Sequence, residues 1–351
     1  MEFGLFVEPQ VGGTHRRLVE LAQWAEDNGL AAFARSDHYL NMADSAHATD
    51  ALASLAAVAV ETSRIRLVTL VSPITFRHPA VMAKTATTID EISDGRFTLG
   101  VGTGWMESEH EAFDLDLPVL KERFERLEEA LAYIRSVFEG HGETTGTHYS
   151  LRRADVAPTG SDGLQIVVGG GGPKKTPTLA GTYADEYNMF VTDAATLEAR
   201  TAVMRAAARD AGRDPAAILV SMAGPALVFA DEDRYRTELS ARATRREMAP
   251  EEERRPGRHT EPFVEADQQR DPVVGDLLAI AGGDLVAGSL EGRAGEHAVD
   301  VHLGHAVADS VPGPLFAPAG ESACQPDLEA EMLVLGIDHH VSTGIAKEEP
   351  R

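Results

Sequence analysis

The stretch "LQIVVGGGGPKKTPTLAG", residues 164–181, carries the local pattern that decides the fold. Five residues typical of a buried strand lead into four glycines, and a helical pattern follows Pro173. Proline suits the first turn of a helix, so we expect a strand, a tight turn and a helix that begins at Pro173. These three pieces make one βα unit, and repeated units of this kind build a parallel sheet.

The same unit recurs through the first two-thirds of the chain. We expect strands at 3–7, 30–34, 65–71, 96–102, 164–169, 185–190 and 218–230, and helices from Thr14 to Gly29, Asp50 to Thr62, Pro79 to Ile92, 119–138, after Pro173, at 193–211 and from Asp231. Apolar runs without strict alternation are typical of strands buried on both faces. Seven such units predict an α/β fold, an eight-fold (β/α)8 TIM barrel, with an open doubly wound sheet as the alternative.

The pattern breaks at two places. Residues 141–163 combine Gly, Thr, His and Tyr with short alternation, which predicts an inserted hairpin or long loop. After Met248 the chain is charged and loses its apolar periodicity. We therefore expect a barrel over 1–248 and an atypical, partly disordered C-terminal region over 249–351. That region lacks a recognisable eighth βα unit and should be cut first by protease near Arg254, Arg255 or Arg258.

Composition narrows the classes of function. The 351 residues include 56 acidic and 32 basic side chains, a net charge of −24, which argues against a nucleic-acid partner. The single cysteine, Cys324, excludes an intrachain disulfide and a cysteine-based zinc site. No apolar run has the length of a membrane span, and no signal-peptide pattern opens the chain, so we expect a cytoplasmic protein with no membrane partner. The sequence leaves open whether it acts as a homodimer.

Histidines gather in the last part of the chain, where a metal site is one interpretation. They are His297, His302, His305, His339 and His340. No pair stands in a recognisable ligand frame with an acidic partner, so we favour scattered exposed histidines and expect no metal.

Polar or glycine-rich segments follow four successive strands, where ligands bind in parallel α/β folds. They contain Asp37 and His38, then Ser72, then Gly102, Thr103 and Gly104, then Gly170, Gly171 and Gly172. A histidine beside an aspartate can move protons near neutral pH. Glycines before a helix expose backbone N–H groups to an anion, and Lys174 and Lys175 would add positive charge. Each segment alone is also explained by turn chemistry, but the four together favour a ligand site.

Three longer motifs carry a resemblance to a known family. They are "SDHY" at 36–39, "RHPAVMAKTATTIDEISDGRFTLGVGTGW" at 77–105 and "VVGGGGPKKTPTLAGTYADEYN" at 167–188. Over about residues 1–240 the chain resembles the luciferase-like monooxygenase superfamily, and more closely its branch that uses the deazaflavin coenzyme F420. The resemblance implies a (β/α)8 barrel that holds a flavin or deazaflavin at the carboxyl ends of its strands.

The resemblance also implies roles for individual residues. Asp37 would line the cofactor ring, and His38 would donate or accept a proton. Ser72 falls where relatives often have a strained, sometimes cis, peptide behind the ring. The segment 102–104 would flank the ring or its ribityl chain, and the segment 170–172 would take the cofactor phosphate.

The chain departs from the family at one position that bears on substrate. Sugar-phosphate dehydrogenases of this branch have a glutamate directly after Gly-Thr-Gly, where this chain has Trp105, with Glu107 and Glu109 further on. We therefore expect an F420-dependent hydride transfer to or from another small organic molecule. The alternatives are an FMN-dependent monooxygenase and a barrel relative that its altered C-terminus has inactivated.

Overall fold

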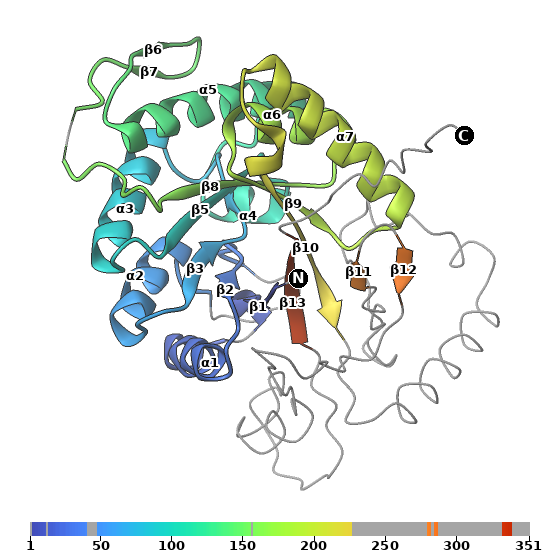
Figure 1. The fold of residues 1–351 in the computed structure, drawn as a ribbon. Helices are drawn as coiled ribbons and strands as arrows, with labels where there is room; N and C mark the ends of the chain where they lie inside the picture. The colour runs from blue at the N-terminus through green and yellow to red at the C-terminus, as the bar shows by residue number, and fades with distance from the viewer. Residues whose placement is uncertain are drawn as a thin grey trace, which may run out of the picture.

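The computed structural model describes residues 2–11, 13–40, 48–155, 157–226, 279–281, 284–286 and 332–338. In these residues the strands form a central barrel and the helices lie around it (Figure 1). The predicted helix from Asp231, the five clustered histidines, Cys324 and the expected protease site near Arg254 lie outside the described residues. The domain boundary at residue 248 stays a prediction.

The elements follow the predicted alternation of strands and helices. The strands are β1 (Glu2–Val7), β2 (Ala32–Arg35), β3 (Arg66–Thr69), β4 (Ser72–Pro73), β5 (Phe97–Gly102), β6 (Thr144–Thr145), β7 (Ser150–Leu151), β8 (Gln165–Gly169), β9 (Glu186–Phe190), β10 (Leu219–Ala226), β11 (Ala279–Ala281), β12 (Asp284–Val286) and β13 (Met332–Asp338). The helices are α1 (His15–Asp27), α2 (Ala51–Glu61), α3 (Pro79–Ile92), α4 (Glu107–Ala112), α5 (Leu120–Glu139), α6 (Lys175–Tyr183) and α7 (Ala194–Asp210), with short 3-10 turns at Pro9–Val11 and Pro215–Ala217.

The main sheet closes on itself. Its order is β3-β2-β1-β13-β10-β9-β8-β5-β4, and β3 also pairs with β5 through Leu67↔Phe97 and Val68↔Thr98. The neighbouring pairs β1–β2, β2–β3, β3–β5, β5–β8, β8–β9 and β9–β10 are all parallel. The predicted α/β barrel is therefore confirmed. Because these seven strands run the same way, their carboxyl ends meet at one mouth.

The eighth place in the ring belongs to β13, which runs against its neighbours. It pairs antiparallel with β1, for example Leu5↔Val334, and antiparallel with β10, for example Ala223↔Leu335. The mouth therefore receives the beginning of β13, whereas every other strand of the ring brings its carboxyl end there. Because of this reversed direction, the eighth strand is not part of a regular βα unit.

Local sequence signals fix the ends and the buried faces of the helices. The Thr14 hydroxyl accepts the N–H of Arg17 and caps α1, while an Asp50 carboxylate oxygen accepts the N–H of Ala53 and caps α2. The buried face of α1 is formed by Leu18, Leu21, Ala22 and Ala25, which recur at helical spacing. Both helices therefore begin where the sequence predicts.

Strand residues divide between two cores according to the two-residue period of a strand. In β2, Phe33 belongs to the large core between sheet and helices, while Ala32 and Ala34 belong to a smaller core with Phe6, Val68, Leu70, Val167 and Ala223. The interior also holds an ion pair, with Arg66 Nη2 2.5 Å from Glu186 Oε2.

Three local features differ from the sequence analysis or refine it. Residues 141–163 contain the antiparallel pair β6–β7, which corresponds to the hairpin of the two alternatives predicted there. The helix expected to begin at Pro173 begins instead at Lys175, with Lys174 as its N-cap residue, so the prediction that Pro173 opens the helix is wrong. The sequence analysis also did not predict α4, a six-residue helix directly after the glycines of β5.

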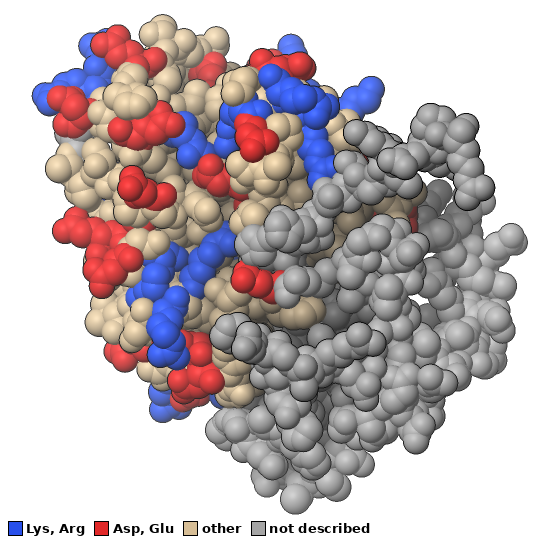
Figure 2. All heavy atoms as spheres, in the orientation of Figure 1, with Lys and Arg blue, Asp and Glu red and all other residues tan. Residues whose placement is uncertain are grey.

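Acidic and basic side chains are interspersed on the face drawn in Figure 2. On α5, opposite charges also pair one helical turn apart, as in Lys121–Glu125 and Arg126–Glu122. Among the described residues, no helix is both long and apolar enough to cross a membrane.

Candidate active site at the mouth of the barrel

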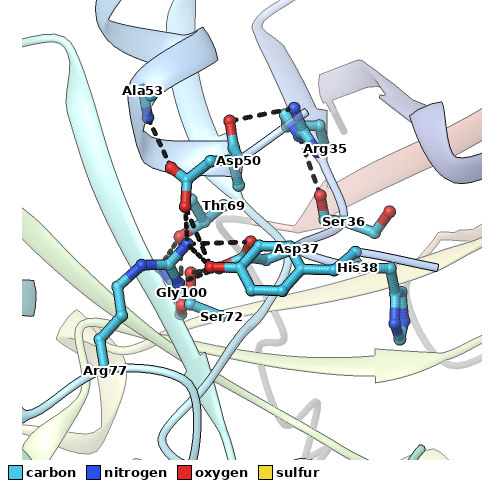
Figure 3. Close-up of polar contacts among 12 residues, drawn as sticks. Arg35, Ser36, Asp37, His38, Asp50, Ala53, Thr69, Ser72, Arg77 and Gly100 are labelled. Carbon is cyan, nitrogen blue, oxygen red and sulfur yellow. Dashed lines mark hydrogen bonds and ion pairs between the residues drawn. The ribbon is translucent and has the colours of Figure 1, made fainter. Parts of the chain in front are cut away.

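The segment after β2 supplies the first buried polar cluster of the mouth (Figure 3). Asp37 is buried, and its Oδ2 accepts a hydrogen bond from Ser72 Oγ at 2.7 Å. The same oxygen lies 2.5 Å from Arg77 Nη1, and Oδ1 lies 3.3 Å from Nη2. The structure therefore brings together two residues predicted from separate strand ends, Asp37 and Ser72, and adds the cation of Arg77 from the loop between β4 and α3.

Arg77 joins the mouth to the start of α2. Its Nη2 donates to Tyr39 Oη at 2.8 Å and also pairs with Asp50 Oδ2, and Tyr39 Oη donates to the same Asp50 oxygen at 3.1 Å. Burial opposes the charge of Arg77, but Asp37 and Asp50 outweigh it and raise its pKa. Two carboxylates thus compensate one buried guanidinium.

A second arginine, Arg35, lies fully buried beside this cluster. Its guanidinium donates to the Ser36 and Thr49 carbonyls at 2.9 and 2.7 Å and to Ser54 Oγ at 2.5 Å. Burial lowers its pKa to about 10. These hydrogen bonds connect the end of β2 to the segment that leads into α2. They therefore connect the two ends of the loop that carries Asp37 and His38.

His38 turns away from the Asp37–Arg77 cluster (Figure 3). Its Nδ1 lies 2.9 Å from Glu109 Oε2, and its ring meets the ring of Trp105 edge to face, with centroids 5.6 Å apart. Trp105 is 48% exposed. His38 and Asp37 are neighbours in sequence but serve different parts of the mouth.

Three carboxylates from three segments of the chain influence the charge state of His38. Burial of the ring opposes protonation, but the hydrogen bond and charge of Glu109, with the charges of Glu8 and Asp37, outweigh it and raise the pKa of His38. Burial in turn raises the pKa of Glu8, which follows β1. A histidine that holds its proton to higher pH than usual is suited to proton transfer near neutrality.

The glycines at the end of β5 make room for Val71. A Cβ at Gly102 would lie 2.8 Å from Val71 Cγ2, and one at Gly169 would lie 2.8 Å from Val71 Cγ1. The Leu70–Val71 peptide bond is cis, whereas the resemblance pointed to Ser72. Gly104 has φ +77, a conformation that favours glycine, and its carbonyl accepts a hydrogen bond from Arg123. Thr103 lies between them, half-buried at the mouth.

The Gly-rich corner differs in detail from the prediction. The N–H of Gly170 donates to Asn188 O at 3.2 Å, so the expectation that it points outward unpaired is wrong. Within the described residues, the N–H groups of Gly171 and Gly172 donate to no protein group. A Cβ at Gly171 would meet no atom within 4 Å. The corner therefore offers an open approach to two backbone donors, just before Lys174 and Lys175.

The sequence analysis did not identify several residues of the site. Arg77 meets Asp37 across 40 positions of sequence, Tyr39 meets Asp50 across 11, and Glu109 meets His38 across 71. Glu109 was noted only for lying after Trp105, and no local pattern marks it as a partner of His38. The described residues hold no group of three or more His, Cys, Asp or Glu side chains arranged to bind a metal ion.

Known proteins resemble this chain in both sequence and structure. Residues 1–296 match the family model described as luciferase-like monooxygenase. The F420-dependent glucose-6-phosphate dehydrogenase of Microbacterium testaceum is 36% identical over 173 residues, which are 48% of this chain and 51% of that protein. The chain thus spans about half the length of the curated relatives it matches.

Two solved structures share the fold. The coenzyme F420 dependent tetrahydromethanopterin reductase from Methanopyrus kandleri is 26% identical with a TM-score of 0.56, covering 66% of this chain and 68% of that chain. An F420-dependent secondary alcohol dehydrogenase, in complex with an F420–acetone adduct, is 25% identical with a TM-score of 0.57, covering 63% and 68%.

Proposed function

Because the chain belongs to the luciferase-like monooxygenase family, we propose that it is an oxidoreductase that moves a hydride between coenzyme F420 and a small organic substrate. The observation that carries the proposal is His38, whose ring stands at the carboxyl ends of the strands between Glu109 and the exposed face of Trp105. Relatives in sequence and in structure that use F420 support this choice of coenzyme.

The residues at the mouth fit a deazaflavin coenzyme. The N–H groups of Gly171 and Gly172, which have no acceptor among the described residues, the open space where a Cβ at Gly171 would stand, and Lys174 and Lys175 beside them suit its phosphate. Asp37, Ser72 and the segment 102–104 would line the ring and its ribityl chain. When bound, the coenzyme supplies the hydride acceptor or donor, which no side chain of the protein can replace.

His38 is proposed to handle the proton that accompanies the hydride. In oxidation of an alcohol, the hydroxyl proton passes to His38 Nε2 while the hydride leaves the carbon; in reduction, Nε2 returns the proton. The half-exposed ring of Trp105, which contacts the His38 ring, would give the substrate an apolar wall. Arg77 is already paired with two carboxylates, so it leaves little positive charge for a phosphorylated substrate.

An FMN-dependent monooxygenase is the second candidate, favoured by the description of the family itself. Equilibrium titration of the full chain with F420 and with FMN, followed by fluorescence quenching, separates the two. We expect tighter binding of F420. Tighter binding of FMN would replace the first candidate by the second, and binding of neither would indicate a barrel that has lost its enzymatic role.

A further inference from the structure

Helix α4 carries two buried polar residues in an otherwise exposed helix. Glu109 is 1% exposed and His110 is 3% exposed, while Glu107, Ser108, Glu111 and Ala112 face solvent. Burying a charged or polar side chain is costly unless hydrogen bonds compensate it. Both buried side chains therefore need hydrogen-bond partners, and both have them.

The partners of Glu109 all lie in the segment after β2. Its Oε1 accepts the backbone N–H groups of Tyr39 and Leu40 at 2.5 and 2.9 Å, and its Oε2 lies 2.9 Å from His38 Nδ1. We propose that Glu109 is a positioning residue, which holds His38 with the hydrogen on Nδ1 and leaves Nε2 as the nitrogen that exchanges protons with the substrate. The catalytic consequence rests on the function proposed above.

The choice of tautomer follows from the hydrogen-bond inventory. A backbone N–H can only donate, so Glu109 Oε1 accepts from both Tyr39 and Leu40. An ionised carboxylate offers acceptors alone, so the contact between Oε2 and His38 requires that Nδ1 carry the hydrogen. Neutral imidazole has one N–H, and Nε2 is then the free lone pair.

The neighbouring His110 keeps α4 in the place this role requires. Its Nδ1 lies 2.7 Å from Met106 O and its Nε2 lies 2.7 Å from Thr75 Oγ1, in the loop after β4. The helix is thereby fastened to one loop through His110 and to the loop of His38 through Glu109. Because both loops end parallel strands, the position of the His38 ring is tied to the barrel itself.

The charges that face His38 come from three elements. They are Glu109 of α4, Glu8 after β1 and Asp37 after β2. Of the three, Glu109 also makes the direct hydrogen bond, so it alone combines charge with orientation. Replacing its charge without changing its shape should alter the titration and the tautomer of His38 together.

Glu109→Gln makes that replacement. The amide oxygen can still accept from Tyr39 and Leu40, but the amide nitrogen can only donate to Nδ1 and so should move the ring hydrogen to Nε2. Nitrogen-15 NMR of the full chain labelled in histidine reports the tautomer, with the signals absent from His38→Ala assigned to His38. Glu107→Gln, an exposed neighbour on the same helix, is the matched control.

Above the titration of His38, we expect pyrrole-type Nδ1 and pyridine-type Nε2 signals in the parent protein and in Glu107→Gln. We expect these to be exchanged in Glu109→Gln, with the His38 titration moved to lower pH. A parent protein with the hydrogen on Nε2, or a Glu109→Gln variant with the parent tautomer, would overturn the proposal. The parent measurement stays decisive should the variant fail to fold.

This test is independent of the coenzyme. The spectra are recorded without F420 or FMN, so a failure of both to bind would sink the proposed function and leave the tautomer result intact. Conversely, tight F420 binding together with the wrong tautomer would overturn only the role of Glu109.

Discussion

Arg77 and Asp37 form a buried ion pair, with Nη1 2.5 Å from Oδ2, between the loops that follow β3 and β2. Asp37 is also bound by Ser72, and Arg77 by Asp50 and Tyr39, so the pair is the centre of a network that joins the β2–α2 and β3–α3 connections. Removal of one partner of a buried pair leaves the other charge without compensation, which is costly.

We therefore expect Arg77→Met to lower the free energy of unfolding by about 3–5 kcal/mol, since two carboxylates lose their partner. Arg16→Met is the control, because the Arg16 side chain is 89% exposed and its pair with Glu20 should contribute no more than about 1 kcal/mol. Denaturant unfolding measures both. Equal small losses would show that Arg77 does not hold these loops together.

His38→Ala should fold and bind coenzyme but lose about 10²–10⁴-fold in turnover, the usual range for a positioned acid or base. The reason is that the variant removes Nε2 and leaves Asp37, Ser72 and Gly171 in place. Coenzyme titration and steady-state kinetics on the same preparation separate binding from chemistry. Unchanged turnover would make His38 a structural residue.

Gly171→Val should weaken coenzyme binding far more than Lys174→Ala. A Cβ at Gly171 meets no protein atom within 4 Å, so the larger side chain should enter the ligand's space without disturbing the fold. An exposed ion pair from Lys174 contributes only about 0–1 kcal/mol. Fluorescence titration compares the two, and circular dichroism checks that both fold.

The isolated deazaflavin ring system without phosphate should bind Gly171→Val and Lys174→Ala like the parent protein. Normal binding of intact F420 by a folded Gly171→Val variant would mean that the glycines form only a turn. The phosphate would then lie elsewhere in the mouth.

Stability should fall with pH through the titration of His38. The pKa of His38 is raised in the folded protein, so the native state binds more protons than the unfolded state between the unfolded value of about 6.5 and the higher folded value. The contribution of His38 is thus complete below that window and lost above it. Denaturant unfolding across the window should show a shallower fall in His38→Gln than in the parent.

His141→Gln is the matched control for this pH series, since the His141 side chain is 76% exposed. It should keep the slope of the parent. An identical slope in His38→Gln and in the parent would contradict the raised pKa of His38.

The sequence by itself determined the elements and the mouth. Helix ends such as Thr14 and Asp50 are set by hydrogen bonds that span three residues, and the buried face of α1 follows from its periodicity. The βα alternation makes the strands parallel, and this places the segments after β2, β3, β5 and β8 at one end of the barrel. These signals are local, so a single sequence displays them.

Only the tertiary structure decided which side chains meet at that end. Asp50 is recognisable as a helix cap, yet its bond to Arg77 depends on the distance between two loops. The approach of Glu109 to His38, across 71 positions, depends on β3 pairing directly with β5 and on α4 turning its buried side inward. Likewise β13 takes the eighth place antiparallel. Such contacts form only when the ring of strands closes. Closure of the ring sets the distances between the strand ends, and the local conformational preferences of the residues do not.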